Sequence, residues 1–239
     1  MITEKHFALS HAAFWHQLLP TAEGYVRECN TEAARFQEPL ESSLPPSQRG
    51  MINEVAFRLF AAGIRLASSP AKLSPDVIEE CIREARDHIL RMREAQRVPV
   101  QAPEKAGIVE AVTLAGRIEK FFETGSPGTP VVSPRFLGCG WLDACQADVL
   151  AEGVLFEVKA GERGFRSIDL RQVLCDLGLN FAAKFYDIRD VCLVNPRSGR
   201  YVSETVERLC QRTAGRPAVE VLGDIVEYIS EPPGRYASG

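Results

Sequence analysis

Three charged residues within one short segment have types and spacing that suit chemistry at a metal ion. Two apolar runs flank Glu152-Gly153, and an acidic residue followed by Gly predicts a tight β-hairpin turn. In the register that this turn sets, Asp148 lies opposite Glu157 on the neighbouring strand. Lys159 follows two residues later and therefore lies on the same face. The hairpin thus predicts two carboxylates and one ammonium group close together.

Two carboxylates at that separation repel each other unless something neutralises them. A hard divalent cation does so, and Mg²⁺ favours one or two carboxylates together with water and phosphate oxygens. We therefore expect Asp148 and Glu157 to bind Mg²⁺ or Mn²⁺, and Lys159 to hold a water, a hydroxide or a phosphate oxygen. Asp143 competes with Asp148, but the register places it near the far end of the sheet. The plain alternative is a surface hairpin with solvated Glu and Lys side chains.

The segments around this hairpin alternate between helical and extended patterns. Apolar residues at helical spacing predict one helix before the hairpin and one after it, and short β-type runs predict four strands. The expected order is helix 105–123, strand 130–133, strand 141–150, strand 154–160, helix 169–185 and strand 190–194. The charged residues then lie on the second and third strands.

Asp148 followed by Glu157-Val158-Lys159 resembles the motif of the PD-(D/E)XK nuclease superfamily. The resemblance covers residues 106–200, the extent of the αβββαβ core of that superfamily, although Ala147 replaces the Pro that often precedes the Asp. It implies a restriction-endonuclease-like α/β fold, with a mixed central sheet flanked by helices on both faces. It also implies metal-dependent hydrolysis of phosphodiester bonds that leaves a 5′-phosphate.

The resemblance gives further residues a role. The first helix of the core often supplies an acidic metal ligand, for which Glu110 is the candidate and Glu119 the reserve. The second helix carries a Gln-x-x-x-Tyr signature in some members, and Gln172 stands at its first position. Asp176 replaces the Tyr, so Gln172 is expected to contact substrate or water without a base-stacking Tyr beside it.

Basic residues follow the third strand directly. Arg163 and Arg166 lie among small residues, and Arg171 lies near the start of the next helix. A guanidinium group matches phosphate geometry, so these three side chains are expected to contact the backbone of a nucleic acid. Arg197 and Arg200 would extend this basic rim. The alternative for the loop is ordinary solvent exposure.

Length and charge suit a soluble globular protein of one or two domains, with 239 residues, 25% of them charged, and a net charge of −4. Its expected parts are an N-terminal helical module (1–100), the nuclease-like core (101–200) and C-terminal helices with a tail (201–239). Further helices are expected up to residue 35 and at 48–67, 74–96, 203–212 and 219–229. The N-terminal helices offer a surface for a homodimer or a protein partner.

The cytoplasm is the expected location, with no membrane partner. No apolar run approaches the ~20 residues of a membrane span, and the first residues lack the apolar stretch of a signal peptide. Seven scattered Cys residues without a Cys-x-x-Cys pair indicate reduced thiols. The acidic net charge counts mildly against nucleic-acid binding, but it does not exclude an enzyme whose positive charge is local.

The expected function is a Mg²⁺-dependent nuclease acting on DNA, or on RNA; a role in antiviral defence or in repair follows only from association with the superfamily. No His follows His88, which excludes a His-based nuclease site in the core. Neither a Gly-x-x-x-x-Gly-Lys phosphate loop nor a Gly-x-Ser-x-Gly elbow occurs. The alternative is a non-catalytic nuclease-fold module that binds a protein partner or nucleic acid within a larger complex.

Overall fold

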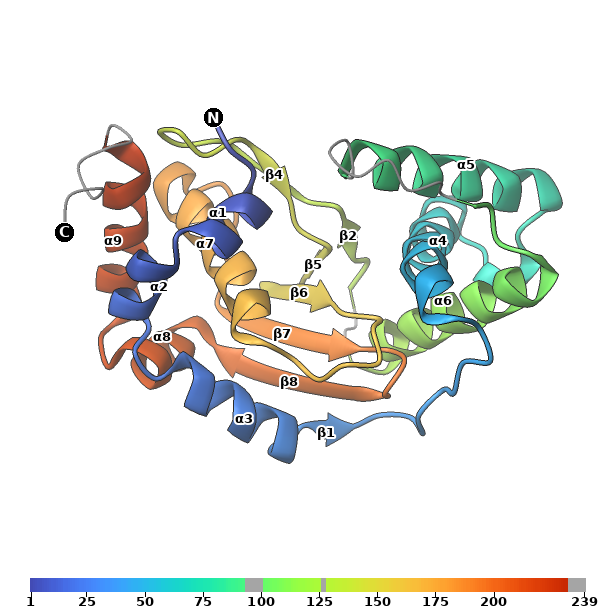
Figure 1. Ribbon diagram of the computed structural model, residues 1–239, viewed down its shortest axis with the longest axis horizontal. Helices are drawn as coiled ribbons and strands as arrows, with labels where there is room; N and C mark the ends of the chain where they lie inside the picture. Colours follow the sequence, from blue (N-terminus) through green and yellow to red (C-terminus); the bar gives the residue numbers. More distant parts are fainter. Residues whose placement is uncertain (93–100, 126–127, 232–239) are drawn as a thin grey trace.

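The computed structural model describes residues 1–92, 101–125 and 128–231, which fold as helices around a mixed β-sheet (Figure 1). Within these residues there are nine α-helices, and the expected α/β class is confirmed. The helices are α1 (Glu4–Ser10), α2 (Ala12–Leu18), α3 (Ala22–Glu32), α4 (Pro46–Leu66), α5 (Pro75–Met92), α6 (Lys105–Gly125), α7 (Ser167–Ala183), α8 (Val206–Ala214) and α9 (Ala218–Ser230).

The main sheet has the strand order β1-β8-β7-β6-β5-β2. Its strands are β1 (Ala34–Arg35), β2 (Val131–Val132), β5 (Val149–Ala151), β6 (Val154–Val158), β7 (Asp190–Asn195) and β8 (Arg200–Thr205), while β3 (Arg135–Phe136) and β4 (Cys145–Gln146) form a separate pair. Strands β6 and β7 are parallel, and the other neighbours are antiparallel. Parallel neighbours need a crossover connection, which α7 supplies.

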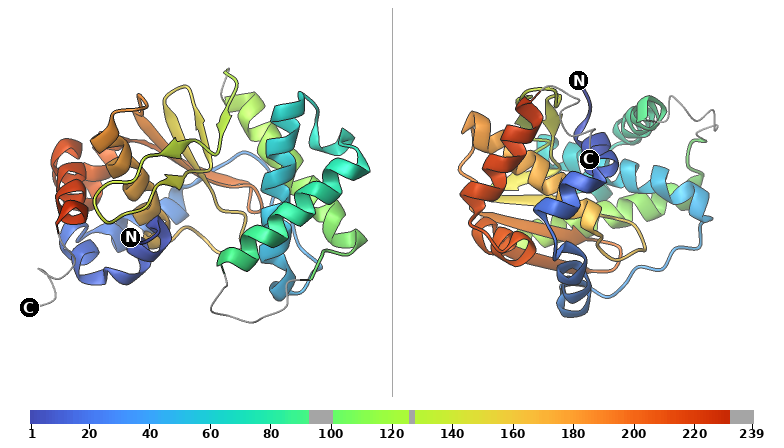
Figure 2. Two further views of the ribbon diagram at one scale, coloured as in Figure 1. Left: turned by 90° about the horizontal axis from the view of Figure 1, so that it is seen from above. Right: turned by 60° about the vertical axis from the view of Figure 1, so that its left-hand side comes forward.

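Alternate residues of the central strands point into two different cores. Leu155 and Leu193 pack with α1–α3 and α7–α9, whereas Phe156 and Val194 pack with α4–α6. This alternation is the two-residue period of a β-strand. Figure 2 shows the two groups of helices with the sheet between them. The expectation of a mixed sheet with helices on both faces is confirmed.

Residues 1–92 contribute to both cores. Helix α1 packs against α7, and α3 packs against α7 and α8, while α4 packs against α5 and α6. Strand β1 pairs with β8 and so joins the main sheet. The residues expected to form an N-terminal module therefore build parts of both helical layers.

Strand β8 is a correction to the sequence-based prediction, which placed a helix from residue 203. Residues 200–205 instead pair along their whole length with β7. The β-type residues Tyr201 and Val202 favour this pairing. Helix α8 begins only at Val206, where the Thr205 hydroxyl accepts a hydrogen bond of 3.1 Å from the N–H of Arg208 and caps the helix.

Two expected elements are broken into shorter pieces. The strand expected at 141–150 is divided between β4 and β5. The N-terminal stretch expected as one helix contains α1, α2 and α3. Pro20 lies between α2 and α3, where its ring is incompatible with a continuous helix.

Candidate active site

The hairpin between β5 and β6 forms in the predicted register. Leu150 pairs with Leu155, and Glu152 and Gly153 form the two-residue turn. Their φ angles are 52° and 79°, both positive as a type I′ turn requires. Glu157 lies two residues after Leu155 and therefore on the same face of β6, the face that packs with α7.

Asp148 lies one residue before β5, and its side chain bonds to the backbone of β6. Its Oδ2 accepts a hydrogen bond of 2.7 Å from the N–H of Val158. Its carbonyl oxygen accepts one of 2.8 Å from the N–H of Ser133. The backbone ladder therefore stops before the expected pairing of Asp148 with Glu157, yet both carboxyl groups line the same cavity.

The ammonium group of Lys159 joins the hairpin to α7. Its Nζ donates one hydrogen bond to Oε1 of Glu157 and another, of 2.9 Å, to Oε1 of Gln172. Oδ1 of Asp169, near the start of α7, lies 3.7 Å from the same nitrogen. Glu157, Gln172 and Asp169 are all buried. The ammonium group is therefore held in place by oxygen atoms on two packed elements, and the sequence prediction had named Glu157, Lys159 and Gln172.

The electrostatic environment contains more carboxyl groups than cations. Burial and the neighbouring charge of Glu157 raise the pKa of Asp148 to about 7. Burial, and after it the charge of Glu157, also raises the pKa of Asp176 well above its ordinary value. Burial opposes the charge on Lys159, but the carboxylates of Glu157 and Asp148 outweigh it and raise the pKa of Lys159. A divalent cation would relieve this excess of acidic groups.

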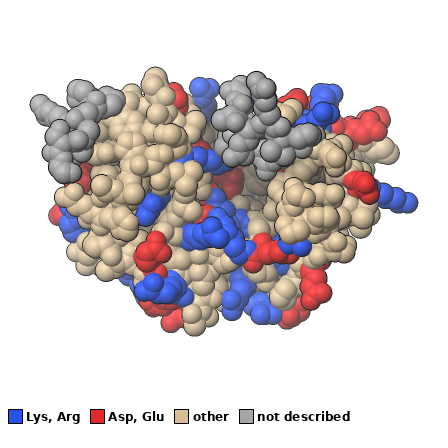
Figure 3. All heavy atoms as spheres, in the orientation of Figure 1, with Lys and Arg blue, Asp and Glu red and all other residues tan. Residues whose placement is uncertain are grey.

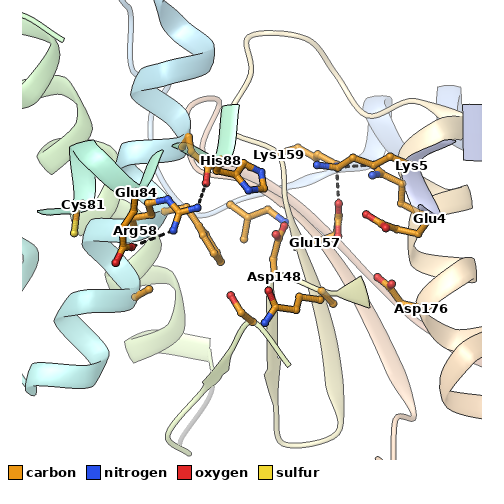
Figure 4. A pocket seen from close by; sticks show the side chains of 18 of the residues that line it. Glu4, Lys5, Arg58, Cys81, Glu84, His88, Asp148, Glu157, Lys159 and Asp176 are labelled. Atoms are coloured by element: carbon orange, nitrogen blue, oxygen red, sulfur yellow. Dashed lines mark hydrogen bonds and ion pairs between the residues drawn. The ribbon is translucent and has the colours of Figure 1, made fainter. Parts of the chain in front are cut away.

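A cavity of about 470 Å³ lies over these residues. The hairpin, α7 and the start of α1 form one side of it, and α4 and α5 form the other side (Figure 4). Lys and Arg side chains gather near the centre of the molecular face seen in Figure 3. The far wall of the cavity contains Glu54, Phe57, Arg58, Arg65, Cys81, Glu84 and His88. The candidate site is therefore enclosed by helices from both layers of the fold.

Glu110 does not line this cavity, which corrects its expected role as a metal ligand. Its carboxylate accepts a hydrogen bond of 2.8 Å from the hydroxyl of Ser42 and forms an ion pair of 2.8 Å with Arg197. Because Arg197 is buried, this pair fixes Glu110 away from the hairpin, and Arg197 is not part of a basic rim. Neither Glu119 nor Asp143 lines the cavity.

The three arginines expected to contact phosphates also lie outside the cavity lining. Arg163 donates two hydrogen bonds, of 2.7 and 2.8 Å, to the buried carboxylate of Asp169. Arg171 donates one of 3.4 Å to the carbonyl oxygen of Ala8. Arg166 is exposed and directly precedes α7. Arg163 and Arg171 thus connect parts of the fold, and Arg166 remains at the surface.

Other cations line the cavity and were not predicted from the sequence. Lys5 comes from α1, and Arg58 and Arg65 come from α4. The sequence contains only weak evidence that these cations line a cavity. Arg58 and Arg65 are seven residues apart and so share one helical face, but nothing in the sequence indicates which surface that face meets. Asp176 also lines the cavity, although the sequence suggested it only as the replacement for a Tyr.

Carboxylate oxygens are ligands that Mg²⁺ and Mn²⁺ prefer, and Asp148 and Glu157 both line the cavity. In the part of the chain that the structure describes, no group of three or more His, Cys, Asp or Glu side chains is arranged to hold a metal ion. Mg²⁺ does not require such a group, because water and substrate phosphate complete its octahedral shell around one or two carboxylates. Burial, and after it the charge of Glu157, raises the pKa of Asp148, and a cation beside these two carboxyl groups would lower it.

Comparisons with protein-family models, with curated proteins and with solved structures found no match for this chain. Among the described residues, no helix has both the length and the apolar character needed to cross a membrane. The functional interpretation therefore depends on the geometry of the chain itself.

Proposed function

We propose that the protein is a metal-dependent nuclease that hydrolyses phosphodiester bonds of DNA, or of RNA, in the cavity over the β5–β6 hairpin. The observation that carries the proposal is the position of Lys159, whose Nζ binds both Glu157 and Gln172 beside the carboxyl group of Asp148. Two carboxylates, an ammonium group and an amide around one space suit a reaction in which negative charge develops on phosphate.

Each of these residues has a distinct role in the proposed reaction. Asp148 and Glu157 would hold the Mg²⁺ or Mn²⁺ ion, which supplies Lewis acidity and lowers the pKa of a bound water. Lys159 would stabilise the charge that develops on the phosphate, because its partners fix the direction of its N–H groups. Gln172 accepts from Lys159 through Oε1, which leaves its amide N–H groups to donate to water or phosphate.

The order of the elements also supports the proposal. Helix α6 is followed by β2, β5 and β6, which pair antiparallel, and then by α7 and by β7, which runs parallel to β6. The resemblance to PD-(D/E)XK nucleases implies this order, with the small β3–β4 pair inserted here between β2 and β5. Glu157 and Val158 lie on β6 and Lys159 follows it directly, while Asp148 lies one residue before β5.

Cleavage assays on Asp148→Ala, Glu157→Ala and Lys159→Ala test the proposal. The wild-type protein is incubated with plasmid, single-stranded DNA and RNA, with Mn²⁺ or with EDTA. We expect cleavage only with Mn²⁺, and its loss in both carboxylate variants because each removes a cation ligand. Lys159→Ala should reduce the rate by ~10²–10³-fold, the usual effect of removing one donor at a developing charge.

Asp143→Ala is the matched control, because it removes an aspartate that lies close in sequence but outside the cavity lining. It should cleave at the wild-type rate. Cleavage that persists in EDTA, or full activity in all three site variants, would contradict the proposed site.

A further inference from the structure

One face of α4 lines the cavity opposite Asp148 and Glu157. Phe57, Arg58 and Arg65 lie on this face, at the three- and four-residue spacing of a helix, with the small residues Ala61 and Ala62 between them. The same helix packs into its core through other residues, among them Val55 and Leu59, while Ala62 and Phe57 lie at the border between that core and the cavity. Arg58 and Arg65 are the charged residues that α4 presents to the cavity.

Arg58 has hydrogen-bonding capacity that its protein partners do not satisfy. Its two Nη atoms donate to Glu54 at 2.8 Å and to Glu84 at 3.1 Å, which holds the guanidinium group at the cavity wall. Its Nε is buried and has no hydrogen-bond partner. A buried donor without a partner is costly.

Arg65 and Lys5 add two further cations from different elements. Arg65 is exposed at the cavity, and its side chain makes no ion pair with any of the described residues. Lys5 extends from α1 into the same cavity (Figure 4). The charge of Lys5 acts on both Asp148 and His88, which lie on opposite walls. A phosphate backbone that passes between the walls would therefore meet cations on both sides.

With a divalent cation bound, the formal charge of the cavity also suits an anionic ligand. Six carboxyl-bearing residues and four Lys or Arg residues line it. A divalent cation at Asp148 and Glu157 would bring its formal charge to neutral. A negatively charged strand is then attracted to the unpaired cations instead of being repelled by the acids.

The size of the cavity and one aromatic ring favour single-stranded over double-stranded nucleic acid. A volume of about 470 Å³ is within the range of pockets that enclose one small ligand, so it accommodates part of one strand. The partly buried ring of Phe57 provides a flat surface for a base. An aromatic surface beside a basic groove is the usual means of binding single strands without sequence preference.

We infer that the α4 wall binds single-stranded nucleic acid, with a base against Phe57 and the phosphate backbone at Arg58, Arg65 and Lys5. This inference rests on the proposed nuclease function for its choice of ligand. It also assigns substrate binding to residues of α1 and α4 instead of Arg163, Arg166 and Arg171.

Fluorescence anisotropy with labelled DNA tests the inference. The probes are a single strand of about 12 nucleotides and a blunt duplex of the same sequence. Lys159→Ala serves as the background in the presence of Mg²⁺, because it slows cleavage while the two carboxylates remain. We expect the single strand to bind at least about tenfold more tightly than the duplex, with Phe57→Ala weakening single-strand binding about fivefold or more.

Arg65→Ala and Lys5→Ala should each weaken single-strand binding and lower the salt slope of log K by about 0.7, the loss of one phosphate contact. Arg83→Ala is the matched control, because Arg83 is exposed on α5, pairs with Glu80 and does not line the cavity. Equal affinity for the duplex, or wild-type affinity in all three test variants, overturns the inference. Single-strand binding that depends on these residues, in a protein that cleaves nothing with Mn²⁺, upholds the inference and contradicts the nuclease proposal.

Discussion

The carboxyl group of Asp148 titrates near neutral pH, because burial and the charge of Glu157 raise its pKa to about 7. Cation binding at the proposed site must therefore displace a proton from Asp148 in much of the protein at neutral pH. The affinity for Mg²⁺ or Mn²⁺ should rise as the pH increases through about 7. Lys159 remains charged over this range, because its own pKa is raised.

Asp148→Asn should stabilise the metal-free protein, by an amount that depends on pH. The folded state holds a proton on Asp148 that the unfolded state releases above its ordinary pKa of 3.8, so wild-type stability falls as the pH rises toward about 7. The Asn variant has no carboxyl group to titrate, so its stability does not fall in this way. Its free energy of unfolding should exceed that of the wild type by on the order of 2 kcal/mol above about pH 7. Thermal melts in EDTA measure it.

Asp143→Asn is the control for these melts, because Asp143 lies outside the cavity lining. Its stability should follow the wild-type pH profile within about 0.5 kcal/mol. An Asp148→Asn variant whose melting temperature also follows the wild-type profile would show that burial and the charge of Glu157 do not raise the pKa of Asp148.

At the scale of secondary-structure elements, the sequence correctly predicted the features that depend only on residues close together in the chain. The turn at Glu152-Gly153 sets the β5–β6 register through two neighbouring residues, and helical spacing correctly placed Gln172 on α7. Strand β8 was missed because its pairing with β7 is tertiary. Arg163 was assigned to phosphate because its partner Asp169 is recognisable only once the loop before α7 is folded.

Arg163→Ala should destabilise the start of α7. Asp169 is almost fully buried, receives two hydrogen bonds from Arg163, and accepts one of 2.9 Å from the backbone N–H of Arg166. Removing the guanidinium group leaves this carboxylate incompletely paired, which should cost about 2 kcal/mol. Urea unfolding with Arg166→Ala as control, expected within about 0.5 kcal/mol of wild type, measures the difference. Equal stability of both variants would restore Arg163 as a candidate phosphate contact.

At the scale of the whole molecule, the candidate site lies where the two helical layers meet across the sheet. The hairpin and α7 provide the residues to which the proposed reaction gives chemical roles, and α1, α4 and α5 enclose them. Sequence reasoning identified the first group because Asp148 and Glu157-Val158-Lys159 form a local motif. It could not identify Lys5, Arg58 or Arg65, since their place at the cavity follows from how α1 and α4 pack on opposite faces of the sheet.

This arrangement also explains why Glu110 was misplaced. The sequence placed Glu110 correctly on a helix before the hairpin, but which face of α6 meets the sheet is decided by packing. The buried Arg197 then binds its carboxylate. The proposed site does not require a third carboxylate, because Mg²⁺ can be held by one or two carboxylates together with water and phosphate.

Isothermal titration of the metal-free protein with Mn²⁺ tests the central claim, that Asp148 and Glu157 together bind a divalent cation. At a pH above about 7, where Asp148 is ionised, we expect saturable binding to the wild type and at least about tenfold weaker binding to Glu157→Gln. Lys159→Ala should bind as tightly as the wild type or more tightly, because it removes a neighbouring positive charge, and Asp143→Asn should be unchanged. A wild-type protein that binds no Mn²⁺, or a Glu157→Gln variant that binds it equally well, would contradict the account.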